Sequence, residues 1–151
     1  MVTCNHLLDN ANLQVVEQLG NIRVMEYQYD LSVTPETAMT SYFASQMNLR
    51  RRQVLIELQN DSYIVQAGAM QWMLGNVSAT TGIKGVGDLF GKAVRGKVTG
   101  ESAIKPEYTG SGILVLEPTY RHLILMDAGS WNGAVALDDG LFLACDSKLK
   151  H

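Results

Sequence analysis

The sequence predicts a mainly β protein, an antiparallel β-sandwich with one or two short helices at its ends. Apolar and polar residues alternate in short runs along much of the chain, which is the pattern of half-buried strands. Turn-forming pairs rich in glycine, asparagine and aspartate separate these runs at intervals of about 8–12 residues, as in all-β folds. Strands do not alternate with long helices, so a parallel α/β architecture is not expected.

The first predicted element is a β-hairpin. Residues 13–19 and 22–30 have the composition of strands and flank Gly20-Asn21, which suits a two-residue hairpin turn. In the second run, Met25, Tyr27 and Tyr29 share one face, and the other face is mixed. The chain is therefore expected to begin with two paired strands.

The clearest helix signal follows the hairpin and begins at Thr34. Thr34 is a suitable N-cap, Pro35 is tolerated in the first turn, and Glu36 is favoured there by the helix dipole. Asn48 can end the helix. One stripe at helical spacing contains Met39, Tyr42, Phe43, Gln46 and Met47. We expect this helix to cover one end or one face of the sheet.

The middle of the chain predicts a second hairpin, a bent strand and a short helix. Residues 54–59 and 62–67 are expected to be the two arms of a hairpin that turns at Asn60-Asp61. Residues 68–75 are too apolar for a loop and predict a bent strand. Between residues 82 and 100, apolar residues recur at helical spacing, although glycines weaken that helix.

The last third of the chain predicts short strands joined by tight connections. One connection is expected at Thr109-Gly110-Ser111 and another at Asp138-Asp139-Gly140. The expected strands are residues 101–105, 112–117, 122–127, 134–137 and 141–144.

Composition limits the class of protein. The chain has 151 residues, of which 46% are hydrophobic and 18% charged, so it is long enough for one compact unit with a real core. A net charge of -3 gives no general attraction to nucleic acid or to an anionic membrane. Apolar runs are too short to span a bilayer, and the first residues lack the features of a secretory signal. Cys4 and Cys145 are expected to be reduced thiols, which favours a cytoplasmic protein.

Motifs for catalysis, metals or cofactors are weak, so we expect no enzyme, metal or cofactor. The glycines between 85 and 91 match neither the dinucleotide nor the Walker A spacing. Ser102 lacks the nucleophile-elbow glycine, and Cys145 is followed by an acid, which disfavours a reactive thiolate. His122 is expected to have a surface or hydrogen-bonding role rather than a metal-binding or basic one.

Two groups of residues are candidates for contact with a partner. Apolar and aromatic residues that could form an oligomer interface or a ligand site are Met70, Trp72, Met73, Tyr108 and Trp131. Basic residues that could contact an anion or RNA are Arg50, Arg51, Arg52, Lys92 and Arg95. For the basic group, a solvated face or internal salt bridges are the competing interpretation.

Five short segments in a fixed order resemble one known family. They are residues 64–70 (IVQAGAM), 73–76 (MLGN), 95–102 (RGKVTGES), 108–112 (YTGSG) and 140–144 (GLFLA). Together they resemble the altered-inheritance-of-mitochondria, or Aim-type, family over about residues 53–147. The resemblance implies a TRAP-like fold, named after the tryptophan-responsive RNA-binding attenuation protein, in which small antiparallel β-sandwich units usually occur in tandem.

Two departures from the family pattern shape the functional expectation. Residues 1–52 form an N-terminal extension, expected to pack on the module at 53–151, and the chain stops near where a second module would begin. We therefore expect a homo-oligomeric, non-enzymatic assembly protein that associates through β edges and a Met/Trp-rich surface. The alternatives are a small-ligand-binding module, walled by Trp72, Tyr108 and Trp131, and an RNA- or anion-binding TRAP-like protein.

Overall fold

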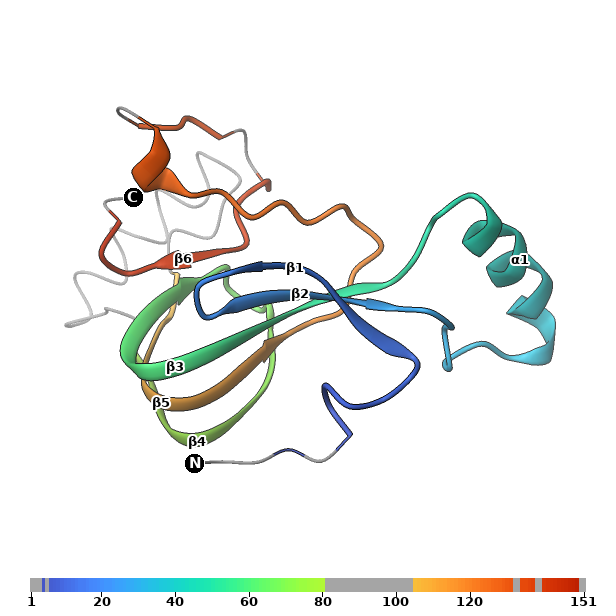
Figure 1. The fold of residues 1–151 in the computed structure, drawn as a ribbon, viewed down its shortest axis with the longest axis horizontal. Coiled ribbons are helices and arrows are strands. Elements are labelled where there is room, and N and C mark those ends of the chain that lie inside the picture. Colours follow the sequence, from blue (N-terminus) through green and yellow to red (C-terminus); the bar gives the residue numbers. More distant parts are fainter. Residues whose placement is uncertain (1–3, 5, 81–104, 132–133, 138–139, 150–151) are drawn as a thin grey trace, which may run out of the picture.

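The protein is mainly β, as the sequence predicts. The computed structural model describes residues 4, 6–80, 105–131, 134–137 and 140–149, and all statements below concern these residues. Figure 1 shows a curved sheet from which one helix projects. The elements are β1 (Leu13–Leu19), β2 (Ile22–Tyr27), α1 (Pro35–Gln46), β3 (Arg52–Val65), β4 (Met70–Thr80), β5 (Glu107–Leu116), the short 3-10 helix η1 (Ala128–Ser130) and β6 (Ala144–Asp146).

All six strands belong to one antiparallel sheet whose organising element is β3. The strand order is β1-β2-β3-β5-β4, and β6 pairs with β3 off this path. One side of β3 pairs first with β2 and then, further along, with β6, whereas β5 follows its other side. The predicted hairpin of β1 and β2 is confirmed, and it is joined to the rest of the sheet through β3.

The expected hairpin turn at Asn60-Asp61 is wrong, because β3 continues through these residues. The register with β5 shifts between Gln59 and Asp61, and Asn60 has a φ of 64°. The Asp61 carboxylate accepts a hydrogen bond from the Gln59 N–H at 2.8 Å, so a local Asx contact is present without a chain reversal. The turn-like residues therefore form a β-bulge, which bends one strand instead of joining two.

The expected turn at Thr109-Gly110-Ser111 is also wrong, because these residues lie inside β5. The glycines of this stretch permit a close approach between neighbouring strands. A Cβ atom at Gly112 would lie 2.1 Å from the Leu74 carbonyl oxygen, and one at Gly110 equally close to that of Asn76. Glycine is thus required here by the spacing of β4 and β5, not by a turn.

Two apolar clusters cover opposite faces of the sheet, because successive residues of a strand point to opposite sides. On β3, Val54 and Ile56 belong to the larger cluster, whereas Leu55 belongs to the smaller one. Other members of the larger cluster are Leu58, Tyr63, Val65, Tyr108, Leu114 and Leu116. The smaller cluster is completed by Leu13, Met25 and Val115.

Much of the C-terminal third is irregular where strands were expected. Residues 122–127 and 134–137 belong to no strand, and the expected strand at 141–144 is reduced to a start of β6 at Ala144. Leu123 and Leu143 still pack against the larger cluster, and the Gln66 N–H donates to the Leu143 carbonyl at 2.8 Å. These segments therefore contribute partly buried side chains to the larger cluster, but they do not form the expected ladder of backbone hydrogen bonds.

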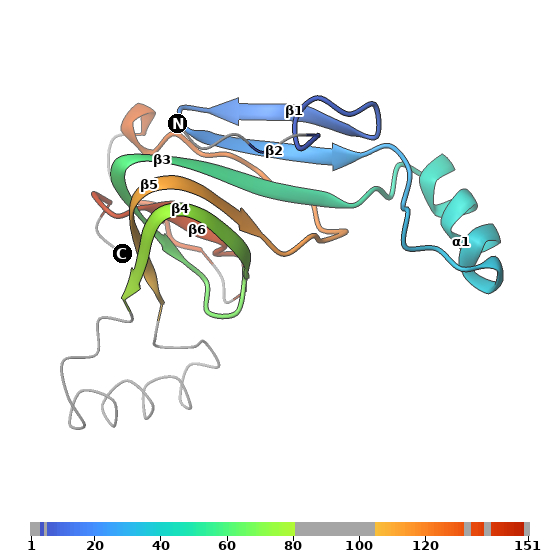
Figure 2. The same ribbon diagram turned by 90° about the horizontal axis from the view of Figure 1, so that it is seen from below.

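The predicted helix is confirmed as α1, but its expected packing is wrong. The helix ends at the expected place, where Asn48 adopts a φ of 61° after the cap residue Met47. No residue of α1 is buried, and Figures 1 and 2 show it projecting beyond the end of the sheet. The apolar stripe therefore covers neither sheet face, and no residue of α1 belongs to either apolar cluster.

Several expectations fall on residues 81–104, which lie outside the described part of the chain. They are the helix between 82 and 100, nearly all of the strand at 101–105, the glycine loop, Ser102, Lys92 and Arg95. Within the described part, no helix has the length and apolar character needed to cross a membrane.

Candidate functional site

The three consecutive arginines lie where the projecting segment returns to the sheet. Because the backbone is extended here, Arg50 and Arg52 point to one side. Both reach the carboxylate of Glu26 on β2: Arg52 Nη2 lies 2.7 Å from Oε2, and Arg50 Nε lies 3.7 Å from Oε1. Arg50 Nη1 also donates to the Gln28 carbonyl oxygen at 3.1 Å. One partly buried carboxylate thus balances two guanidinium groups.

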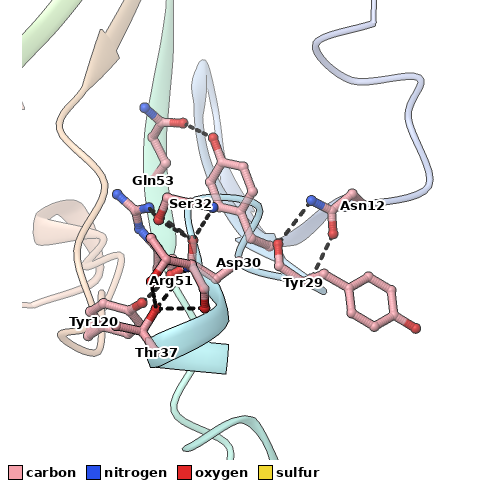
Figure 3. A network of polar contacts seen from close by, with 10 residues as sticks. Asn12, Tyr29, Asp30, Ser32, Thr37, Arg51, Gln53 and Tyr120 are labelled. Atoms are coloured by element: carbon pink, nitrogen blue, oxygen red, sulfur yellow. Dashed lines mark hydrogen bonds and ion pairs between the residues drawn. The ribbon is translucent and has the colours of Figure 1, made fainter. Parts of the chain in front are cut away.

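Arg51 points to a different set of partners, shown in Figure 3. Its Nη1 lies 3.2 Å from Asp30 Oδ1 and 3.0 Å from Ser32 Oγ, and its guanidinium carbon lies 5.9 Å from the centre of the Tyr120 ring. The Tyr120 hydroxyl donates to the other oxygen of Asp30. This cluster links the start of the projecting segment to both β3 and the chain that follows β5.

The Asp30 carboxylate is stabilised in its charged form. Burial would raise its pKa, but hydrogen bonds from Ser32, Tyr120 and Arg51 outweigh that effect and hold the pKa well below its usual range. The same hydrogen bond raises the pKa of Tyr120, because the phenol must remain protonated to donate. Asp30 is therefore an ionised acceptor at neutral pH, engaged entirely by neighbouring donors.

His122 has the hydrogen-bonding role that the sequence predicts. Its Nδ1 lies 2.8 Å from Arg52 Nη1, and because a guanidinium group only donates, Nδ1 is the acceptor. The same arginine exchanges two backbone hydrogen bonds with Thr119, at 2.7 and 2.8 Å. These contacts attach the segment after β5 to the start of β3.

The internal pairing of the arginines bears on the predicted anion site. Arg50, Arg51 and Arg52 each contact a carboxylate. Arg50 also donates to the Gln28 carbonyl oxygen, and Arg51 to the Ser32 hydroxyl oxygen. Charges that are neutralised in this way offer little to a further anion. The geometry therefore favours the competing interpretation, internal salt bridges, for these three residues.

A shallow hollow of about 310 Å³ lies beside the Asp30 cluster. Its lining residues are Tyr27, Asp30, Leu31, Ser32, Arg51, Gln71 and Pro118. The Tyr27 hydroxyl donates to Gln53 Oε1 at 2.7 Å, and Gln53 Nε2 donates to Gln71 Oε1 and to the Leu116 carbonyl. Burial raises the pKa of Tyr27, and Arg51 opposes that shift. The polar groups around the hollow are thus occupied by one another.

The structure distributes the predicted apolar site residues over different surfaces. Tyr108 is buried in the larger cluster, whereas Trp72 packs against the smaller one on the opposite sheet face. Trp131 is exposed directly after η1. The three aromatic residues expected to wall one ligand site are therefore not brought together. Met70 packs on the larger cluster, and Met73 lies exposed on β4.

The outer edge of β4 is the least protected edge of the sheet. Within the part that the structure describes, this strand of eleven residues pairs with β5 alone. It contains no charged residue and no proline, and its single bulge lies at its beginning, between Met70 and Trp72. By contrast, β1 carries Glu17 and has a bulge at its centre. The extension of β4 to Thr80 was missed in the sequence, although Val77 and Thr80 are β-branched residues that favour strands.

Few side chains among the described residues are placed to bind a metal ion or to act as a nucleophile. Groups of three or more histidine, cysteine, aspartate or glutamate residues that could hold a metal ion are absent there. Cys4 and Cys145 are both free. Burial raises the pKa of the Cys145 thiol, and Asp146 adds to the shift while Lys105 opposes it. The thiol is therefore protonated at neutral pH and poorly nucleophilic.

Comparison with known proteins gives one match. The family model described as "Mitochondrial biogenesis AIM24" matches residues 45–151, which is more than two thirds of the chain. No curated protein and no solved structure matches the chain. The matched region begins within α1 and includes β3 to β6, so the hairpin of β1 and β2 precedes it.

Proposed function

We propose that this chain, which belongs to the mitochondrial biogenesis AIM24 family, is a non-enzymatic assembly protein whose copies pair through the outer edge of β4. The observation that carries the proposal is the length and neutrality of that edge. Natural sheets usually protect an edge with lysine, proline, a central bulge or a covering segment, because free N–H and C=O groups recruit another strand.

The edge is also regular enough to accept a strand. Gly110 and Gly112 allow the β4 backbone to lie very close to β5, which fixes the β4 strand in the sheet. The bulge lies before Trp72, so the stretch from Met73 to Thr80 keeps an uninterrupted register with β5. A strand held in this way presents, at strand spacing, the backbone groups that no described segment pairs with, which is what an added strand requires.

A second copy of the chain is the partner that this edge suits. Two identical strands can pair antiparallel about a two-fold axis, which gives a closed, self-complementary interface. Met73 and Leu74 are 41% and 40% exposed. Covering them would contribute on the order of 1 kcal/mol each, in addition to the new ladder of hydrogen bonds. Neither strand carries a charge that would oppose the pairing.

The pairing of polar side chains supports a non-enzymatic role. Glu26 and Asp30 are engaged by arginines, and the Cys145 thiol has a raised pKa. Acid–base or nucleophilic catalysis instead requires a group that can exchange a proton with a substrate or attack it.

Hydrogen exchange of the β4 amides at several protein concentrations tests the proposal. We expect residues 70–80 to become more protected as concentration rises. Asn76→Lys with Ser78→Lys should abolish this dependence, because both residues are exposed on β4 and lysine is a natural edge protector. The matched control places the same two lysines on β1, as Gln14→Lys with Glu17→Lys, and should leave β4 unchanged. Protection of β4 that is independent of concentration in the unmodified protein would refute the proposal.

A further inference from the structure

The projecting segment, residues 29–49 and here called the arm, carries an unusual amount of exposed apolar surface. Leu31 is 81% exposed, Met39 72% and Met47 78%. Tyr42 and Phe43 form an edge-to-face pair with ring centres 5.6 Å apart, and both are mostly exposed. Apolar patches of this size on folded proteins usually mark sites of interaction.

The arm is held firmly at its base. The backbone N–H and carbonyl of Tyr29 both bond to the Asn12 side chain, at 2.6 and 3.0 Å. Arg51 and Tyr120 hold Asp30 from the other side, as Figure 3 shows. Inside α1, the Thr37 hydroxyl accepts from the Thr34 N–H at 2.9 Å. A clamped base reduces the ordering cost that binding would otherwise incur.

The charge and area of the arm indicate what could cover it. Between residues 31 and 49 the only charged residue is Glu36, so the arm offers no basic groups to phospholipid headgroups or nucleic acid. Aromatic side chains bury about 150–250 Å² each, so its exposed large apolar residues together present on the order of 800–1,000 Å². That is close to the roughly 800 Å² per partner of a standard protein interface.

Further exposed apolar residues lie in the segments before and after η1, at the other end of the same molecule. They are here called the C-terminal apolar surface and are Ile124, Met126, Trp131, Val135, Leu137 and Leu141; the exposed Asp127 lies among them in the sequence. Figures 1 and 2 show η1 and α1 at opposite ends of the sheet. The arm of one subunit therefore does not cover the C-terminal apolar surface of that same subunit.

We propose that two copies of this chain exchange arms, so that α1 of each copy packs on the C-terminal apolar surface of the other. Two elongated molecules arranged antiparallel about a two-fold axis bring each arm beside the partner's opposite end, and both contacts form together. The apolar residues of α1 recur at helical spacing, as in helices that bind grooves. A dimer with exchanged arms contains two such contacts, so its total buried area exceeds that of a standard dimer interface. The inference rests on the arm and is independent of β4 pairing.

Light scattering coupled to size exclusion tests this inference in the full chain carrying Asn76→Lys and Ser78→Lys, which removes β4 pairing. In this background we expect a particle of twice the 16.6 kDa chain mass. Met39→Glu with Phe43→Lys places opposite charges four residues apart, which supports the helix while removing its apolar contact. Ile124→Glu with Leu141→Glu changes the receiving surface. Each pair should raise the dissociation constant by on the order of 100-fold or more.

Mixing the two variants distinguishes arm exchange from other contacts. Each variant alone has no intact contact, whereas a mixed pair combines one intact arm with one intact receiving surface. We therefore expect the mixture, and neither variant alone, to recover a dimer, and the control Thr40→Glu on α1 to behave as the unmodified arm. A monomer in the β4-blocked background, or a mixture that stays monomeric while far-ultraviolet circular dichroism shows both variants folded, would overturn the inference. Failure of β4 pairing itself would leave these outcomes unchanged.

Discussion

Replacement of Gly112 by alanine tests the close approach of β4 and β5 that the assembly proposal requires. The added Cβ would meet the Leu74 carbonyl oxygen at 2.1 Å and Val77 Cγ2 at 2.8 Å. The carbonyl belongs to the backbone of the neighbouring strand, so relief requires β4 to move by roughly 1 Å, because ordinary contacts of this kind are about 3.3 Å. A side-chain rotation cannot provide this relief.

The change in the free energy of unfolding caused by Gly112→Ala is the balance of opposing effects. Overpacking typically costs about 1–3 kcal/mol, and each weakened ladder hydrogen bond adds about 0.5–1.5 kcal/mol. The loss of glycine flexibility in the unfolded chain returns about 0.4–1 kcal/mol. We therefore expect Gly112→Ala to reduce the free energy of unfolding by roughly 2–3 kcal/mol, which lowers the melting temperature by several degrees in a chain of this size.

Urea denaturation followed by tryptophan fluorescence measures this change. The control is Gly129→Ala, because a Cβ there meets only the Asp127 side chain, at 3.2 Å, and that side chain can move. We expect the control to shift the unfolding midpoint very little. If Gly112→Ala unfolds at the same urea concentration as the unmodified protein, β4 and β5 are not in the close contact described, and the support for a rigid β4 edge is lost.

Two further predictions concern titratable groups. Tyr120→Phe removes a hydrogen-bond donor to Asp30 and should destabilise the protein at neutral pH. Because the pKa of Asp30 is lower in the folded than in the unfolded protein, this stabilisation is present above the unfolded pKa of about 4. It is lost as the pH falls through the folded-state pKa. Unfolding midpoints of both proteins at pH 7 and at lower pH measure this, and an unchanged difference would contradict it. Iodoacetamide should label Cys145 more slowly in the folded than in the urea-unfolded protein near pH 8.5, because burial raises its pKa. Mass spectrometry of the labelled peptide gives the rate, and equal rates would exclude the shift.

Local sequence patterns predicted the elements whose structure depends on near neighbours. The hairpin at Gly20-Asn21 and the helix that starts at Pro35 and stops near Asn48 both follow from turn and capping residues within a few positions. The region with the family motifs was also recognised, and the family match confirms it. These features require no knowledge of distant partners.

The errors concern contacts between segments far apart in the chain. Asn60-Asp61 has the composition of a turn, but β3 continues through these residues as a bulge because it pairs with β5, some fifty residues later. Helical spacing in α1 identified an apolar stripe without identifying what it faces. The partners of the arginine run are likewise distant in sequence: Glu26 on β2 and His122 beyond β5.

Because β2 and β6 both pair with β3, the chain cannot be shortened to the family region without disturbing the sheet. On one side of β3, Arg52–Ile56 pairs with β2 and Tyr63–Val65 pairs with β6. Strands from the N-terminal and C-terminal parts of the chain therefore pair with the same strand. Deleting residues 1–44, which precede the family match, would remove Leu13 and Met25 from the smaller cluster and expose the edge of β3 at Arg52–Ile56. The hairpin and the family region should consequently melt in a single cooperative transition, and a shortened chain should precipitate rather than behave as an autonomous domain.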